Sequence, residues 1–273
     1  MTALRRIALR VPGDEAESLR ARLIELSPRG FEELDVGGGT VELVVYADAA
    51  FADDLLAELP GATAEPVPEG WEDAWRAFHR PAVVAGLWLG PPWETPPEPA
   101  RAIVIDPGRA FGTGSHATTR LCVDLLAGTE RRGSLLDVGC GSGVLAIAAA
   151  RLGFAPVLAV DVDQVAVETT RANASVNRVA IDARVADALT APLPRADVAV
   201  ANVLLDPVET MLRRLDADEA ITSGYLAGER PFHDGWEHVE SRELDGWSAD
   251  RFRRHGRVGP GSATLRGVGA EAG

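Results

Sequence analysis

Three glycines at alternate positions mark the segment of the chain best suited to bind a cofactor. Gly139, Gly141 and Gly143 follow the apolar run of 134–138 and precede a second apolar run that begins at Val144. This pattern predicts a buried strand, a tight turn and the start of a helix. Glycine lets the backbone turn sharply and approach a ligand, and a helix start presents free N–H groups to it. We therefore expect this turn to hold a nucleotide-like cofactor.

The spacing of the glycines distinguishes between cofactors. A dinucleotide-binding turn has the pattern G-x-G-x-x-G, but Val144 occupies the position of its third glycine. The pattern here is D-x-G-x-G-x-G, with Asp137 two residues before the first glycine. It resembles the first motif of the class I S-adenosylmethionine-dependent methyltransferases. That resemblance implies S-adenosyl-L-methionine as the cofactor, with contacts from Asp137, Gly139 and Gly141. The alternative is an ordinary glycine-rich loop.

Acidic and amide side chains end three later predicted strands. Asp161 ends PVLAVD, 22 residues after Gly139, while Asp187 ends ARVAD and Asn202 ends ADVAVAN. Ligands of open α/β sheets bind at the carboxyl ends of the strands. We therefore expect Asp161 at the ribose hydroxyls, Asp187 at the adenine amino group and Asn202 beside the methyl group. A helix cap or a turn residue is the alternative for each one, and Asp163 is expected to be an N-cap.

The predicted reaction assigns a catalytic role to Asn202. Methyl transfer is an in-line displacement at a carbon activated by positive sulfur, so catalysis consists mainly of aligning the acceptor with the methyl group. The side-chain carbonyl of Asn202 is suited to accept a hydrogen of an acceptor amine and to aim its lone pair. No general acid or base is assigned.

The elements that position these residues predict an α/β fold with a doubly wound, mostly parallel sheet. From about residue 101, strands alternate with helices, as in a parallel sheet covered on both faces. A further strand is expected at 238–244. The polar segment from Trp247 shows no clear closing strand, and we expect the last dozen or so residues to be mobile. The strands predicted for the sheet are 101–106, 134–139, 156–161, 183–187, 196–202 and 219–224.

The first part of the chain predicts a separate small domain. Its order of strand, helix, two strands, helix and a last strand is the split ferredoxin-like α+β arrangement, with Gly37 to Gly39 joining the middle strands. A linker with a short helix and a strand follows, and in it Trp71 and Trp75 would pack between the two domains. The predicted divisions are 1–64 for the small domain, 65–99 for the linker and 100–273 for the cofactor-binding domain.

Composition excludes several classes of function. Acidic residues outnumber basic ones by 41 to 27, and every basic residue is arginine, so lysine-dependent phosphate loops and Schiff bases are excluded. A net charge of −14 disfavours attachment to a nucleic-acid backbone. The spacing of Cys122 and Cys140 suggests neither a disulfide nor a metal site. Since no apolar run is long enough for a membrane span or a signal peptide, we expect a cytoplasmic protein without membrane contact.

A second motif makes the resemblance specific. The block DPGRAFGTGSHATT at 106–119 precedes the glycine turn, and N-A-x-x-N at 173–177 and A-N-V-L at 201–204 follow it. Together these motifs resemble the ribosomal protein L11 methyltransferase family, PrmA, over nearly the whole chain. The resemblance implies a Rossmann-like methyltransferase domain behind a small ferredoxin-like domain. It also implies methylation of lysine and N-terminal amino groups of ribosomal protein L11, free or on the large ribosomal subunit.

The same resemblance implies roles for individual residues. Phe111 and Gly112 would close over the cofactor, and Thr119 would contact it, as would the residues already named at the glycine turn and the strand ends. Capping of the following helix is the alternative for Thr119. For His116, a hydrogen bond that holds the loop is favoured over a role as general base.

Two departures from the family pattern concern the acceptor more than the cofactor. Ala117 stands where the family usually has proline, and SADRFRR after Trp247 replaces a closing apolar strand. The alternative functions are therefore a methyltransferase of another protein, RNA or a small molecule, and a cofactor-binding interaction protein without turnover. We expect a monomer that needs no direct contact with nucleic acid.

Overall fold

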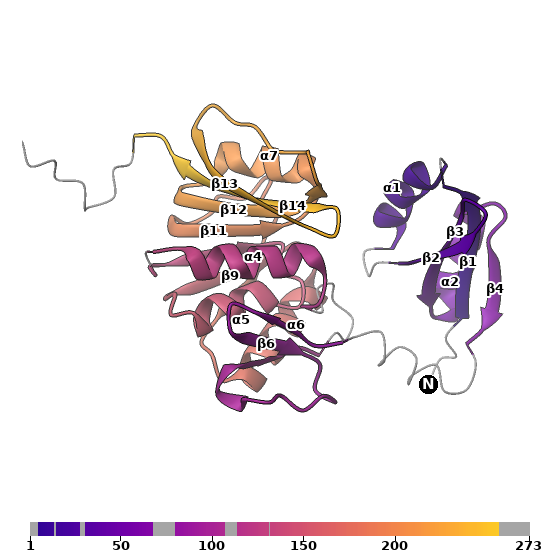
Figure 1. The fold of residues 1–273 in the computed structure, drawn as a ribbon, viewed down its shortest axis with the longest axis horizontal. Helices are drawn as coiled ribbons and strands as arrows, with labels where there is room; N and C mark the ends of the chain where they lie inside the picture. Colours follow the sequence, from indigo (N-terminus) through magenta and orange to yellow (C-terminus); the bar gives the residue numbers. More distant parts are fainter. Residues whose placement is uncertain are drawn as a thin grey trace, which may run out of the picture.

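In the computed structural model of the protein, the described strands form three sheets (Figure 1). The model describes residues 5–13, 15–27, 31–67, 80–106, 114–130 and 132–256. Within these ranges the strands form a four-stranded, a three-stranded and a seven-stranded sheet. None of the described helices combines the length and the hydropathy needed to cross a membrane.

The four-stranded sheet has the predicted ferredoxin-like arrangement. Its order is β2-β3-β1-β4, and all of its neighbouring strands are antiparallel. Apolar side chains alternate inward from the strands and pack against one face of each helix, with Ile7, Leu43 and Leu55 at the centre. The elements are β1 (Arg5–Pro12), α1 (Ala16–Leu26), β2 (Glu32–Gly37), β3 (Thr40–Ala47), α2 (Ala49–Glu58) and β4 (Thr63–Pro66).

The three-stranded sheet corrects two expectations. The segment before residue 99 has two strands, β5 (Ala82–Val84) and β6 (Leu87–Gly90), where we expected one. After the short 3-10 helix η1 (Pro99–Arg101), β7 (Ala102–Val104) runs parallel to β6 and does not join the large sheet. The expected linker helix, with Trp71 and Trp75, lies outside the described residues.

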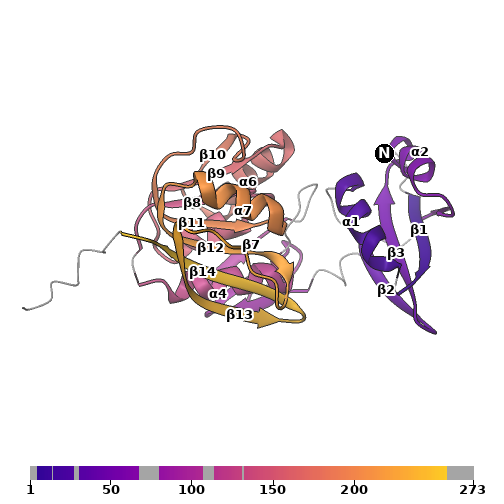
Figure 2. The same cartoon turned by 90° about the horizontal axis from the view of Figure 1, so that it is seen from above.

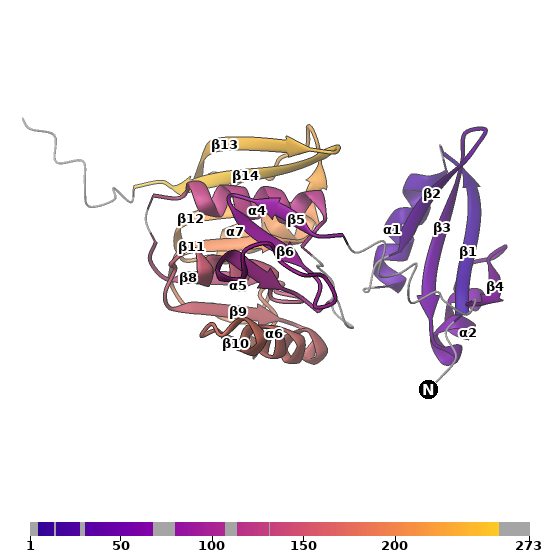
Figure 3. The same ribbon diagram turned by 60° about the horizontal axis from the view of Figure 1, so that its bottom comes forward.

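The seven-stranded sheet is the predicted doubly wound sheet. Its order is β10-β9-β8-β11-β12-β14-β13 (Figure 3). The first five strands are parallel, and β14 is antiparallel to both of its neighbours, β12 and β13. One hydrophobic cluster packs under α4 to α6, another under α7, and α4 and α7 lie on opposite sides of the sheet (Figure 2). The strands are β8 (Leu135–Val138), β9 (Val157–Asp161), β10 (Asp182–Val185), β11 (Ala196–Asn202), β12 (Ala217–Leu226), β13 (Trp236–Leu244) and β14 (Trp247–Arg254). The helices are α4 (Ala117–Gly128), α5 (Val144–Arg151), α6 (Gln164–Asn177) and α7 (Leu205–Arg214).

Strand β14 corrects the expectation that no closing strand follows Trp247. It lies between β12 and β13 and pairs with both in antiparallel register. Ala249 and Phe252 are buried on opposite faces of the sheet, and Asp250 is buried as well. The sequence looks too polar for a buried strand. The strand can nevertheless be buried, because protein hydrogen bonds to Asp250 replace those that water would make. The expected mobile tail lies outside the described residues.

Candidate functional site

The predicted strand, glycine turn and helix are present between β8 and α5. Gly139 has φ +71° and Gly143 has φ +81°, a region that residues with side chains rarely adopt. A Cβ atom on Gly139 would lie 2.7 Å from Cγ1 of Val203, and one on Gly143 would lie 2.8 Å from Cγ2 of Thr170. Glycine is therefore required at both positions, by backbone conformation and by lack of space.

Asp161 ends β9, as predicted, and its carboxylate binds the glycine turn. One oxygen accepts a hydrogen bond from the Gly141 N–H at 3.0 Å, and the other accepts one from the Asp163 N–H at 3.0 Å. Asp163 in turn accepts from the Val165 N–H at 2.8 Å and is the N-cap of α6, as expected. The Asp161 carboxylate thus connects the turn that follows β8 with the turn that follows β9.

Asp137 lies inside β8 and is only 1% exposed. Its Oδ2 accepts from the Ala146 N–H in the first turn of α5 at 3.0 Å. Its Oδ1 is buried and meets no hydrogen-bond donor in the part of the chain that the structure describes. Burial, with a smaller contribution from the charge of Asp161, raises the pKa of Asp137 to about 7. This carboxylate is therefore held in place but not fully compensated.

Asn202 ends β11 and meets the start of α4. Its Nδ2 donates to Thr118 Oγ1 at 3.0 Å and lies 3.5 Å from Thr119 Oγ1, and both threonines are buried. Among the described residues, none donates a hydrogen bond to its Oδ1. The threonines thus orient the amide through its nitrogen, and its carbonyl oxygen takes no part in this contact.

His116 is the N-cap of α4, so the capping alternative for Thr119 is wrong. Its Nδ1 accepts from the Thr118 N–H at 3.4 Å and lies 2.8 Å from the Thr118 hydroxyl. An Nδ1 that accepts from this N–H carries no proton, and partial burial lowers the pKa of the ring. The ring also packs edge-on against Trp247 at 5.1 Å. His116 thus forms its hydrogen bond at the start of α4, and the predicted role of holding the preceding loop stays a prediction.

Asp187 lies two residues beyond the end of β10 and binds its own turn. Its carboxylate accepts from the Thr190 hydroxyl at 2.8 Å and from the Leu189 N–H at 2.9 Å, and these bonds lower its pKa. The turn alternative is therefore confirmed for this residue. Contact with an adenine amino group stays a prediction.

The loop with Phe111 and Gly112 lies outside the described residues, but the chain that leads into it is held precisely. Asn177 accepts from the Val104 N–H at 2.8 Å and donates to the Val104 carbonyl at 2.6 Å. Asn173 accepts from the Asp106 N–H at 3.2 Å and donates to the Ser142 carbonyl at 2.9 Å. Asn177 thus satisfies the N–H and the carbonyl of Val104, the last residue of β7, while β7 pairs with β6.

In the part of the chain that the structure describes, neither a metal site nor a reactive thiol is indicated near the glycine turn. Within the described ranges, no group of three or more His, Cys, Asp or Glu side chains is placed to hold a metal ion. Cys140 is 5% exposed, and burial raises its pKa to about 12. A thiol that stays protonated at neutral pH is a packing residue rather than a nucleophile.

Comparison with known proteins supplies the family. The sequence profile described as "Ribosomal protein L11 methyltransferase (PrmA)" matches residues 43–254. This chain belongs to the PrmA family. Ribosomal protein L11 methyltransferases similar to it include those of Azotobacter vinelandii, 37% identical over 88% of this chain and 96% of the relative, and Symbiobacterium thermophilum, 42% identical over 66% and 64%. A third, from Dechloromonas aromatica, is 45% identical over 62% of this chain and 57% of the relative, so the chain spans less than two thirds of the latter two relatives.

A solved structure agrees with the PrmA assignment at the level of the fold. The ribosomal protein L11 methylase of Lactobacillus delbrueckii subsp. bulgaricus superposes with a TM-score of 0.54 at 27% identity, over 62% of this chain and 94% of that one.

Three residues of this PrmA family member were not given a site role by the sequence. Thr118 orients Asn202, and Asn173 and Asn177 bind the segment before the loop. The spacing of the two asparagines, four apart on one helix face, is a signal for a shared partner. Thr118 could have been found only as one of a pair of threonines at a helix start.

Proposed function

We propose that this protein transfers the methyl group of S-adenosyl-L-methionine to lysine and N-terminal amino groups of ribosomal protein L11. One observation carries the proposal. The oriented amide of Asn202 and the glycine turn lie at the carboxyl ends of adjacent parallel strands, where ligands of such sheets bind. Family membership and the names of the similar proteins support the reaction and the acceptor.

The residues present fit the proposed cofactor. Gly139, Gly141 and Gly143 all have positive φ and form a tight backbone turn before α5, and Asp137 has a buried carboxylate oxygen without a partner among the described residues. A buried, incompletely compensated carboxylate favours a cationic ligand over a neutral one. We assign Phe111, Gly112, Thr119, Asp137, Gly139, Gly141, Asp161, Asp187 and Asn202 to the cofactor site.

The chemistry divides between the ligand and the chain. When bound, the cofactor supplies a methyl group activated by positive sulfur. The chain orients the acceptor. The threonines hold the side-chain nitrogen of Asn202, and the side-chain carbonyl oxygen of Asn202 accepts a hydrogen bond from the incoming amine. Alignment of the amine lone pair with the methyl carbon is the main contribution expected from the protein.

We further propose that three segments of the chain have different functions. Residues 1–64 would recognise the acceptor protein, residues 65–99 would link the domains and residues 100–273 would bind the cofactor. The high negative charge of the chain suits a basic ribosomal protein as partner. We place the reaction in the cytoplasm, with the protein acting as a monomer.

The decisive experiment offers isotope-labelled cofactor and the purified protein to unmethylated ribosomes and to free ribosomal protein L11. Mass spectrometry is expected to find methyl groups on the lysines and the N-terminus of that protein. Asn202→Ala should reduce transfer strongly while a titration still shows cofactor binding. Labelling of RNA or of another protein instead would overturn the acceptor, and binding without any transfer would overturn the enzymatic role.

A further inference from the structure

Val203, the residue after Asn202, is held tightly between two glycines. A Cβ atom on Gly224 would lie 2.2 Å from the Val203 carbonyl oxygen, and one on Gly139 would lie 2.7 Å from Val203 Cγ1. The Val203 N–H also donates to the Ser223 carbonyl at 3.0 Å. The peptide that follows Asn202 therefore rests directly on the backbone of β12, and its side chain rests on the glycine turn.

The contact with Gly224 depends on a β-bulge in β12. The register with β14 pairs Ser223 with Ala249 and then Tyr225 with Ser248, so Gly224 is an extra residue on β12. Its φ of +108° is accessible to glycine and strained for other residues. A bulge interrupts the ladder of hydrogen bonds, so its shape must be held by other contacts.

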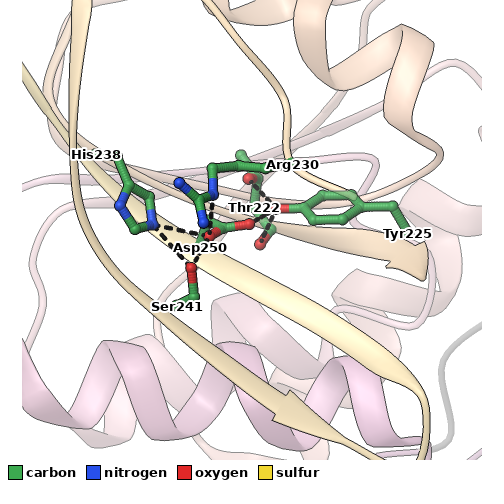
Figure 4. A network of polar contacts seen from close by, with 6 residues as sticks. All are labelled: Thr222, Tyr225, Arg230, His238, Ser241 and Asp250. Carbon is green, nitrogen blue, oxygen red and sulfur yellow. Dashed lines mark hydrogen bonds and ion pairs between the residues drawn. The ribbon is translucent and has the colours of Figure 1, made fainter. Parts of the chain in front are cut away.

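The hydroxyl of Tyr225 contacts Thr222, on the other side of this bulge, and Asp250 (Figure 4). It lies 2.8 Å from the Thr222 hydroxyl and 3.0 Å from the Thr222 carbonyl, on the other side of the bulge, and it donates to Asp250 Oδ2 at 2.9 Å. Tyr225 is 2% exposed, and burial together with the nearby Asp250 raises its pKa, so the hydroxyl keeps its proton and remains a donor.

Asp250 is itself immobilised through its other oxygen. Oδ1 accepts from the Ser241 hydroxyl, lies 2.9 Å from His238 Nε2 and pairs with Arg230 at 3.5 Å. Ser241 and Asp250 both meet the same nitrogen of His238 (Figure 4). A hydrolytic triad needs the serine and the carboxylate on opposite ring nitrogens, so this network is structural rather than nucleophilic.

We propose that Tyr225, anchored by Asp250, is a positioning residue for methyl transfer. It holds the bulge at Gly224 in the shape that supports the Val203 peptide, and this support sets the position of the Asn202 amide relative to Thr118 and the glycine turn. The effect on transfer rests on the proposed function, whereas the effect on the position of Asn202 does not.

The test compares Tyr225→Phe with Ser241→Ala. Each variant removes one hydroxyl that binds Asp250, but only Tyr225 touches the bulge. In NMR spectra of the full-length protein, the side-chain NH₂ signals of Asn202, assigned by their loss in Asn202→Asp, should shift in Tyr225→Phe and stay in place in Ser241→Ala. Unmoved signals in Tyr225→Phe, or equal shifts in both variants, would overturn the inference.

The kinetic readout tests the consequence for transfer. For Tyr225→Phe we expect kcat to fall about tenfold, because a small misplacement of an aligning group costs rate. The KM for the cofactor should change less than about twofold, as expected when ground-state binding is retained. If kcat is unchanged although the Asn202 signals shift, the positioning role in transfer is wrong. If the unmodified enzyme transfers no methyl group, the proposed function fails while the NMR result still decides whether Tyr225 positions Asn202.

Discussion

Two aspartates are buried in the same sheet but are stabilised in opposite ways. Asp250 on β14 is 0% exposed, and both of its oxygens accept hydrogen bonds from neighbouring side chains. Asp137 on β8 is 1% exposed, and one of its oxygens is buried without a described partner. Complete satisfaction makes Asp250 part of the scaffold. The incomplete satisfaction of Asp137 is consistent with the proposed cofactor site, in which a cationic ligand would supply the missing compensation.

The largest expected effect comes from removing the scaffold carboxylate. Asp250→Ala leaves the Tyr225 hydroxyl and the other donors without their acceptor, so the free energy of unfolding should fall by about 3–5 kcal/mol. Urea denaturation at pH 7 measures it. Ser241→Ala, which removes only one donor, should cost about 1 kcal/mol. Equal losses in the two variants would show that Asp250 is not the centre of the network.

Asp137→Asn should raise the free energy of unfolding, whereas Asp250→Ala lowers it, and the gain should depend on pH. Because the folded pKa of Asp137 is raised from 3.8 to about 7, protonated Asp137 stabilises the fold below pH 4, and this contribution is lost as the pH rises to about 7. The difference corresponds to at most ~4 kcal/mol, and asparagine avoids this loss. Asp137→Asn should thus gain stability over the parent as the pH rises from 4 to 7, measured by denaturation without cofactor.

The same variant tests the link between this carboxylate and the ligand. Without the negative charge, the preference for cationic S-adenosylmethionine over the neutral thioether S-adenosylhomocysteine should decrease in calorimetric titrations at pH 8. A stability difference that stays constant between pH 4 and 8 would contradict the raised pKa. An unchanged ligand preference would separate Asp137 from the site.

Asp161→Ala should weaken cofactor binding by about 1.5–3 kcal/mol, the usual contribution of hydrogen bonds to a charged group. The loss has two sources, because Asp161 also holds the Gly141 N–H of the glycine turn. Asp163→Ala is the matched control: it removes a neighbouring carboxylate that caps α6. Undiminished affinity in Asp161→Ala, measured by titration, would remove Asp161 from the cofactor site.

The smallest effect concerns the cysteines. Burial raises the pKa of both Cys122 and Cys140, and the charge of Asp137 raises each of them further. Alkylation of the folded protein with iodoacetamide at pH 8 should therefore be slow, and it should become fast in denaturant. Rapid labelling of the folded protein, followed by mass spectrometry, would show that this part of the core opens.

The two regions also differ in how far their sequences predict them. Parallel strands that are buried on both faces read as apolar runs, so β8, β9 and β11 and the residues at their ends were predicted. Strand β14 was not, because Asp250 and the arginines make its sequence look exposed; its burial depends on donors that lie up to 25 residues away. Strand β7 was assigned to the wrong sheet, since no local pattern shows that it pairs with β6 or that Asn177, 73 residues later, binds the backbone of Val104.

By itself, the sequence determined the glycine turn, the acids and the amide at the strand ends, the cap at Asp163 and the family, because these depend on local backbone sterics and on short motifs. Only the tertiary structure decided that Thr118 orients Asn202 and that Val203 lies between Gly139 and Gly224. It also decided that both oxygens of Asp250 have donors, whereas one oxygen of Asp137 has none among the described residues. Such contacts join distant segments, and their hydrogen bonds require a strand register and a bulge position that no local pattern specifies.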